Sequence, residues 1–552
     1  MKKINKNIYL LLILLALGLL NTACDNFLNV EPTSQLESNY FENENRIDRG
    51  IGSIYGEIAV LFNPNMQSGA FAAKPLYKIW TLPGDEMTTS NNSNSDLEAF
   101  VTLNPSNSSL TSYWSILYAT ISRANFMLEK LQDPKILEVI KTPGRADACK
   151  GEALFLRSYC NMRLWEDFRK APNQNYRIKY IPDAYLEPTN GFELLDQAIS
   201  DLKQAIDLLP NSWNTLNTGR VFKNSARGLL VKCYTLRACY ANKYSGNSTL
   251  DYQNAIHYFE TIDPNVSSIV GVPFGDNFDY RTENNKESLF EYQASFNIKE
   301  DNAWLNNNYG GDAGSVGAIW IQYWSHTNTS YMFGSVFGPS QKLINMLKTT
   351  DPRFDETLIK TYKSNVTGDT YPWVGKLWTV FGGYQFLKYI NKDRRGALDT
   401  KYGNNSINNP RILRLADVKL LAAEAYLQTG NEPEARKQVN DIRLRARASK
   451  AGGVASLTPA DYTSTITMTE IMDERFIELA GEGVRFSDLK RWHVAGYIDL
   501  SKWTSTDFGY DQTIKDAPFS FDTNIHLLFP IPTSEINRNP KMQASGNNPG
   551  YN

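Results

Sequence analysis

Histidine and cysteine are scarce in this chain, which has 552 residues but only 4 histidines and 5 cysteines. The histidines form no HExxH pair, and no spacing of Cys or His resembles a zinc site. Nucleophile elbows, phosphate-binding loops and dinucleotide fingerprints are also absent from the sequence. These absences predict a protein that has no metal, no cofactor and no enzymatic activity.

The chain also lacks an excess of charge of either sign. Its 57 basic and 59 acidic residues leave a formal net charge of −2. No basic surface is therefore expected, and nucleic acid is excluded as a partner. After residue 20, no apolar run approaches the ~18 residues that a membrane-spanning helix needs, so we expect the body of the protein to be soluble.

The one apolar run lies at the N-terminus and has the form of an export signal. Lys2, Lys3 and Lys6 precede the apolar residues 8–20, and the small residue Ala23 is followed by Cys24. This order predicts a lipoprotein signal peptide over residues 1–23, cleavage before Cys24, and acylation of that cysteine. The alternative is an ordinary signal peptide followed by an incidental cysteine, since Asn21 stands where lipoprotein signals usually carry leucine.

Most of the remaining chain shows helical periodicity. The ranges with this pattern are 45–61, 112–132, 147–168, 191–209, 223–241, 251–261, 415–429, 432–448 and 468–493. Several of them form pairs with small residues at the expected crossings. The clearest pair is 416–446, which resembles a tetratricopeptide unit; 150–168 with 192–210 and 223–240 with 252–259 give two more, and 112–132 supplies part of a fourth. We therefore predict a mostly α fold built on tetratricopeptide-like helical repeats.

The four remaining cysteines fall on two of these predicted helices. Cys149 and Cys160 are too far apart along one helix for a disulfide, as are Cys233 and Cys239 along the other. We expect small buried residues at these positions. A disulfide between the two helices stays open as an alternative.

Residues 470–493, EIMDERFIELAGEGVRFSDLKRWH, combine a buried apolar stripe with many charges. Arg475 and Glu478 are three apart and are expected to pair on one helix face. Gly481 and Gly483 predict a break between two helices. We expect this charged block to hold the fold together rather than to touch a ligand. It resembles the signature of the SusD/RagB family, whose members are nutrient-binding lipoproteins of the outer membrane.

Other segments carry the same resemblance over nearly the whole chain. The segment from Leu82 to Asn92 matches an acidic loop of the family, and residues 527–551 (LLFPIPTSEINRNPKMQASGNNPGY) match its C-terminal pattern. Residues 151–168 match a family helix, although Phe168-Arg169 stands where the family usually has glycine. The resemblance implies a less regular, loop-rich subdomain packed on the tetratricopeptide-like helices. It also implies an N-terminal region over 24–220 and a C-terminal region over 221–552.

The predicted ligand site lies in residues 290–410, where aromatic residues are dense among Gly and Asn. The flat face and polar edge of Trp and Tyr suit a sugar ring, which has an apolar face and a rim of hydroxyls. For any single aromatic residue, core packing is the alternative. The candidates are Trp304, Trp320, Tyr323 and Trp324, with Trp80 and Asn91 beside Asp85, the acidic-loop residue that the resemblance assigns to the ligand.

The resemblance then implies the function. We expect a non-catalytic protein, held at the outer membrane by its N-terminal lipid and facing the cell exterior. It would capture an oligosaccharide or polysaccharide and deliver it to a SusC-like TonB-dependent transporter. A peptide-binding member of the same family is the alternative. A glycoside hydrolase is a weaker one, because 59 acidic residues supply many accidental carboxylate pairs.

Overall fold

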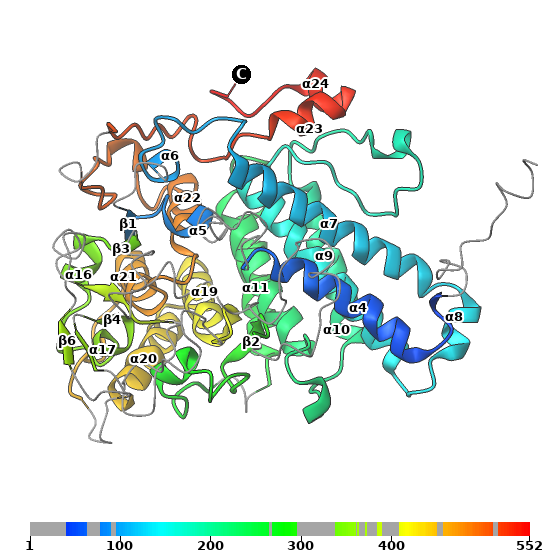
Figure 1. Cartoon of the computed structure of the whole chain (residues 1–552). Helices are drawn as coiled ribbons and strands as arrows, with labels where there is room; N and C mark the ends of the chain where they lie inside the picture. Colours follow the sequence, from blue (N-terminus) through cyan, green and yellow to red (C-terminus); the bar gives the residue numbers. More distant parts are fainter. Residues whose placement is uncertain are drawn as a thin grey trace, which may run out of the picture.

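The structure is a computed structural model of the whole chain (Figure 1). It describes residues 40–62, 78–89, 95–263, 268–294, 337–359, 361–363, 370–372, 384–388, 408–449, 456–511 and 517–551.

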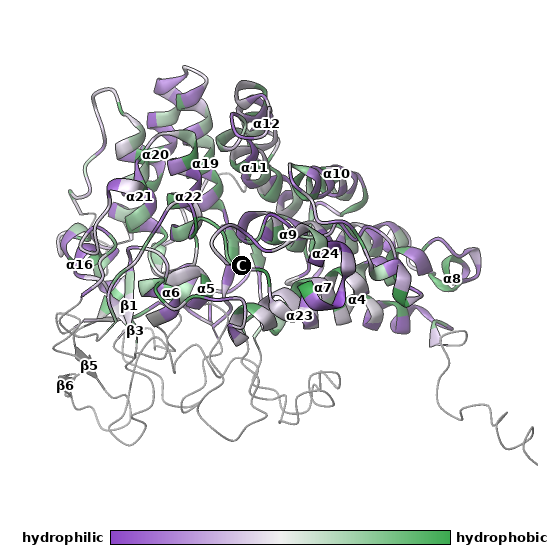
Figure 2. Ribbon diagram, turned by 90° about the horizontal axis from the view of Figure 1, so that it is seen from above, coloured by the Kyte–Doolittle hydropathy of each residue, from purple (hydrophilic) through white to green (hydrophobic). Residues whose placement is uncertain are grey.

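The longer helices pack as successive pairs, and neighbouring pairs contact each other through α7 and α9, α10 and α11, and α12 and α19. Seen from above, they follow one another in a row (Figure 2). The pairs are α4 (Glu44–Ala59) with α7 (Ser108–Lys130), α9 (Arg145–Asp167) with α10 (Glu193–Leu208), α11 (Lys223–Cys239) with α12 (Ser248–Glu260), and α19 (Leu415–Gln428) with α20 (Glu432–Ala448). The prediction of a mostly helical fold built on such pairs is confirmed.

Local sequence explains where several of these helices begin. The side chain of Asn43 accepts a hydrogen bond from the Arg46 backbone N–H at 3.1 Å and caps α4. Asn107 caps α7 in the same way, accepting from the Leu110 N–H at 3.0 Å. Such caps satisfy backbone donors that have no partner within the first helical turn.

Small residues let these elements approach closely. A Cβ added at Gly228 in α11 would lie 2.7 Å from Cδ1 of Leu289. Glycine therefore allows α11 to pack against the strand that contains Leu289.

The four cysteines at positions 149, 160, 233 and 239 are buried and free. The prediction of small buried residues at these positions is confirmed, and the alternative of a disulfide between the two helices is wrong.

The strands are short and pair two by two. In the described part of the chain the pairings are antiparallel: β1 (Met87–Thr89) with β3 (Phe337–Pro339), β2 (Ser288–Glu291) with β8 (Arg411–Arg414), β4 (Leu358–Ile359) with β7 (Gln385–Phe386), and β5 (Thr361–Lys363) with β6 (Thr370–Pro372). The β1–β3 and β2–β8 pairs join segments that are far apart in sequence, whereas β5 and β6 are near each other in the chain. Strands β2 and β8 lie against α11.

The signature block forms α21 (Met468–Glu478) and α22 (Arg485–Ala495) beside α19 and α11. Gly481 and Gly483, with φ of +73° and +72°, separate the two helices as predicted. The shorter helices are α5 (Lys78–Thr81), α6 (Ser95–Ala99), α8 (Pro134–Val139), α16 (Gln341–Met346), α17 (Phe354–Thr357), α23 (Thr533–Arg538) and α24 (Pro540–Ser545). No helix in the described ranges is long and apolar enough to cross a bilayer.

Candidate functional site

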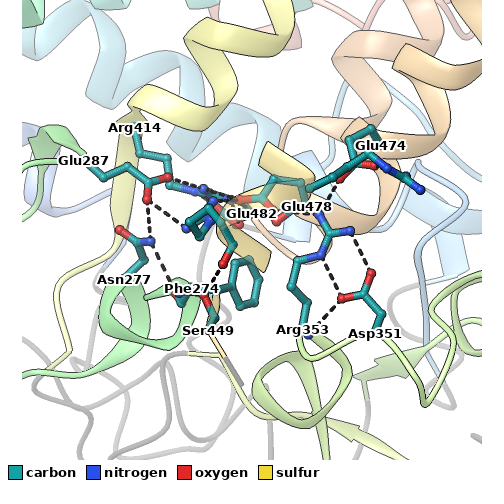
Figure 3. A network of polar contacts seen from close by, with 12 residues as sticks. Phe274, Asn277, Glu287, Asp351, Arg353, Arg414, Ser449, Glu474, Glu478 and Glu482 are labelled. Carbon is teal, nitrogen blue, oxygen red and sulfur yellow. Dashed lines mark hydrogen bonds and ion pairs between the residues drawn. The ribbon is translucent and has the colours of Figure 1, made fainter. Parts of the chain in front are cut away.

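The charged residues of the signature block form a buried network of ion pairs (Figure 3). Arg414 at the end of β8 is at its centre. It pairs with Glu287 at 2.6 Å, with Glu478 at 2.8 Å and with Glu482 at 2.7 Å. Buried charges are tolerated when each is paired and hydrogen-bonded, which is the case here. The network ties the break between α21 and α22 to β8.

Arg353 extends the network to the segment before α17. Its guanidinium pairs with Asp351 at 2.8 Å, with Glu474 at 2.6 Å and with Glu478 at 2.9 Å. Burial opposes ionisation of Glu478, but the guanidinium groups of Arg445, Arg414 and Arg353 outweigh it and hold its pKa well below the ordinary value. Glu478 is therefore a structural anion and has no proton to donate near neutral pH.

One expected pairing within the block is wrong. Arg475 does not pair with Glu478; it contacts Asp417 at 2.8 Å and Asp488 at 2.7 Å. The i,i+3 spacing made the intrahelical pair possible, but carboxylates on α19 and α22 take the guanidinium. The block as a whole holds the fold, as expected from the sequence.

Asp85 lies in the same buried region. It is fully buried, and Arg485 reaches its two carboxylate oxygens at 2.6 and 2.9 Å. Lys342 adds a contact at 2.6 Å. Burial would raise the pKa of Asp85, but the two cations outweigh it and lower that pKa. Both oxygens are thus occupied within the protein. Asp85 fastens its loop to α22 and α16, and these contacts do not support the predicted contact with a ligand.

Trp80 is also largely enclosed. Its Nε1–H donates to the Tyr113 hydroxyl at 3.2 Å, and the Arg163 guanidinium carbon lies 4.7 Å from its ring centroid. Only 6% of Trp80 is exposed, so it offers no open platform for a sugar. It does line a small cavity, described below.

The other predicted site residues lie outside the described residues. They are Asn91, Trp304, Trp320, Tyr323 and Trp324, together with Cys24, so their roles stay predictions. Tyr292 and Tyr384, from the same aromatic-rich stretch, are among the described residues. Tyr292 is buried, and Tyr384 packs edge-on against Phe354 at 5.5 Å.

Three contacts hold the described residues next to the predicted ligand segments. Thr89 pairs with Phe337 in the β1–β3 ladder. The backbone N–H of Ala294 donates to the Asn409 side chain at 2.7 Å. Tyr292 stacks on Phe62, with ring centroids 6.1 Å apart. These contacts hold in place the described residues that flank 63–77, 90–94, 295–336 and 389–407.

A cavity lies between α9, α11 and the β2–β8 pair. Its volume is about 30 Å³, and Trp80, Arg163, Lys232, Phe290 and Arg411 are among its lining residues. This is room for about two water molecules and too little for a sugar ring. Sequence reasoning missed the cavity, because its walls come from segments with no shared motif. The described ranges hold no His, Cys, Asp and Glu cluster suited to a metal.

Two family models match this chain. The model described as "SusD family" matches residues 277–551, and the model described as "Starch-binding associating with outer membrane" matches residues 26–235. The chain belongs to the SusD/RagB family. The prediction made from the signature block and the other matching segments is thereby confirmed.

Relatives align with this SusD/RagB chain over most of its length. SusD-like protein P2 of Formosa agariphila is 25% identical over 469 residues, which cover 82% of each protein. A SusD-like protein of Bacteroides ovatus is 25% identical over 521 residues, covering 87% of this chain and 82% of the relative.

Solved structures have the same fold. A laminarin-binding SusD-like protein superposes with a TM-score of 0.66 at 22% identity, covering 92% of this chain and 100% of the other. A SusD homologue from Bacteroides thetaiotaomicron gives 0.71 at 18% identity, with coverage of 94% and 99%. Surface glycan-binding protein A from Bacteroides uniformis gives 0.66 at 20% identity, with coverage of 92% and 99%. These SusD-like proteins confirm the fold predicted for this chain.

Proposed function

We propose that this protein is a non-catalytic, lipid-anchored binding protein on the outer face of the outer membrane. It captures an oligosaccharide or polysaccharide and delivers it to a SusC-like TonB-dependent transporter. Membership of the SusD/RagB family carries the proposal. The names of two similar structures add support, since one binds laminarin and the other is a surface glycan-binding protein.

The geometry supports a rigid base for ligand-binding segments. Asp85, Arg414 and Glu478 are buried and held by several ion pairs each. Removing one partner from a buried pair typically costs about 3–5 kcal/mol, so these residues resist movement. A binding site whose loops start from such a base needs less ordering when the ligand arrives.

Isothermal titration of the purified protein with a panel of polysaccharides and peptides tests the proposal. The panel includes laminarin, starch and acidic polysaccharides, each with its oligosaccharides. We expect heat of binding with at least one glycan and none with peptides. Binding of peptides alone would replace the proposal with the peptide-binding alternative. Release of reducing sugar from a bound glycan would show a hydrolase instead.

Trp320 is the first residue to test as a glycan platform. We expect Trp320→Ala to weaken glycan binding by about 1–3 kcal/mol, because truncating an aromatic anchor removes its stacking surface. Tyr180→Ala is the matched control: Tyr180 is 72% exposed in the connection between α9 and α10. Titration of both variants with the best glycan of the panel gives the comparison. Equal affinity of Trp320→Ala and the unaltered protein would remove Trp320 from the candidates.

A further inference from the structure

The cavity between α9, α11 and the β2–β8 pair has an unusual balance of charge. Arg163, Lys232 and Arg411 contribute three cationic side chains to its wall, and Glu482 is its one carboxylate among the described lining residues. Both oxygens of Glu482 are already taken by Arg414 and Lys388. Each of the three cations has a carboxylate partner, so what the charged side chains of the wall can still offer is spare N–H donors.

Arg411 has donor capacity to spare. The residue is only 5% exposed, its Nε lies 2.9 Å from Glu291 and its Nη1–H donates to the Asn409 carbonyl at 2.7 Å. Its Nη2 has no hydrogen-bond partner within the described part of the chain. A buried guanidinium donor without an acceptor is costly, and such donors usually have an acceptor that is a water or a ligand.

Lys232 is the second donor with spare capacity. Its ammonium has three hydrogens, and it contacts Asp417 at 3.1 Å. Asp417 also pairs with Arg475, so it keeps a cationic partner even when Lys232 engages another group. In Arg163, by contrast, each of the three guanidinium nitrogens has a partner: Tyr113, Glu166 and Asp167.

The size of the cavity limits what these two donors can bind. A volume of about 30 Å³ accepts a compact group of a few atoms and excludes a sugar ring. A carboxylate or a sulfate ester has this size, and its oxygens match the donors of a guanidinium and an ammonium. Phe62, Trp80 and Phe290 form apolar and aromatic parts of the same wall.

The position of the cavity connects it to the predicted ligand segments. Phe62 and Pro410, both in its wall, are close in sequence to residues 63–77 and 389–407, and Trp80 follows the first of these segments. The described ends of these two segments are therefore beside the cavity.

We propose that this cavity is a subsite for the oxyanion substituent of an acidic glycan, bound by Arg411 and Lys232. The shared chemistry is a carboxylate, as in a uronic acid, or a sulfate ester. The assignment rests on the proposed function, because it names the class of glycan that the protein captures.

Matched pairs of glycans test the subsite. Oligogalacturonate is compared with its methyl ester, and a sulfated oligosaccharide with its desulfated form, by titration at constant ionic strength. We expect at least one acidic form to bind about tenfold or more tightly than its neutral partner, which also distinguishes the carboxylate from the sulfate. Equal binding of the acidic and neutral forms would overturn the subsite and leave glycan capture intact.

Two variants test whether a preference for the acidic glycan comes from the cavity. Lys232→Met removes one donor while Arg475 still pairs with Asp417; Arg411→Lys keeps a cation near Glu291 but removes Nη2. Both are expected to reduce the preference for the acidic glycan to less than about threefold, without changing affinity for a neutral glycan. Lys223→Met, on the same helix but outside the cavity wall, should keep the full preference. An unchanged preference in both cavity variants would overturn the assignment.

A crystal soaked in selenate gives a readout that does not depend on glycan binding. The subsite predicts an anomalous peak beside Arg411 and Lys232 in the unaltered protein and none in Lys232→Met. No peak in the unaltered protein would count against the oxyanion subsite. If the peak appeared and no glycan bound, both the assignment to a glycan and the proposed function would be contradicted.

Discussion

Arg169 shows how a single residue departs from the family pattern and is accommodated. It stands where the SusD/RagB pattern usually has glycine, and its φ is +60°. A non-glycine residue in this left-handed region costs roughly 1–2 kcal/mol. The guanidinium carbon lies 3.3 Å from the centroid of Trp165 and 4.4 Å from that of Tyr240. Stacking between two rings offsets the backbone cost, because a desolvated cation–π contact contributes about 2 kcal/mol.

Two substitutions separate these opposing effects at Arg169. Arg169→Ala loses the stacking and keeps the strained backbone, whereas Arg169→Gly loses the stacking and relieves the strain. Both should be less stable than the unaltered protein, and the glycine variant should be more stable than the alanine variant by about 1 kcal/mol. The urea midpoints of the three proteins measure this order. An alanine variant as stable as the glycine variant would show that the backbone carries no strain.

At the scale of elements, the loop before β1 holds two neighbouring carboxyl groups, Asp85 and Glu86, whose pKa values are shifted in opposite directions. Cations lower the pKa of Asp85, while burial raises the pKa of Glu86 to about 8 and the charge on Asp85 adds to this. The Glu86 carboxyl accepts a hydrogen bond from the Gly481 backbone N–H at 3.1 Å. The loop is thus fixed to the break between α21 and α22 by a neutral carboxyl and to α22 by an ionised one.

The raised pKa of Glu86 makes the stability of this junction depend on pH. The unfolded chain ionises Glu86 near pH 4.5, and the folded chain does so only near pH 8. The contribution of protonated Glu86 to the stability of the folded protein is therefore complete below pH 4.5 and is lost as the pH rises toward 8. Glu86→Gln removes this loss, so the variant should gain stability relative to the unaltered protein between pH 5 and pH 8.

Urea unfolding at pH 5 and pH 8 measures the effect of Glu86→Gln. The difference between the two proteins is the relevant quantity, because Glu283 also has its pKa raised to about 8 and contributes to the pH dependence of both. Glu187→Gln, at an exposed position, serves as the control and should show no such gain. The same stability difference at both pH values would contradict the assignment.

The sequence predicted the secondary-structure elements better than the contacts between them. Helical periodicity located three of the helix pairs and α7 as part of a fourth, and two glycines located the break between α21 and α22. The partner of Arg475 was predicted wrongly, because a spacing rule considers only neighbours on one helix. Its actual partners, Asp417 and Asp488, belong to α19 and α22 and are brought together only by packing.

At the scale of the whole molecule, sequence identified the family but not the surroundings of the site. Asp85 matched a family loop, yet the match gave no sign that Arg485, 400 residues away, takes both its oxygens. The cavity beside Arg411 was equally hidden, since α9, α11, β2 and β8 each contribute a few residues without a motif. The burial of a polar group and the identity of its partners depend on how the whole chain folds. They cannot be predicted from composition or from residue spacing alone.

We propose that Cys24 decides where the whole molecule works, because it is the predicted site of the lipid anchor. We expect Cys24→Ala to move the protein from the membrane fraction to the soluble fraction, because anchoring requires acyl chains that gain about 0.8 kcal/mol for each buried methylene. Asp25→Ala keeps the cysteine and should stay with the membrane. Fractionation after alkaline carbonate washing, which strips proteins held only by a partner, measures both variants. A Cys24→Ala protein that resists this wash would show that the anchor lies elsewhere.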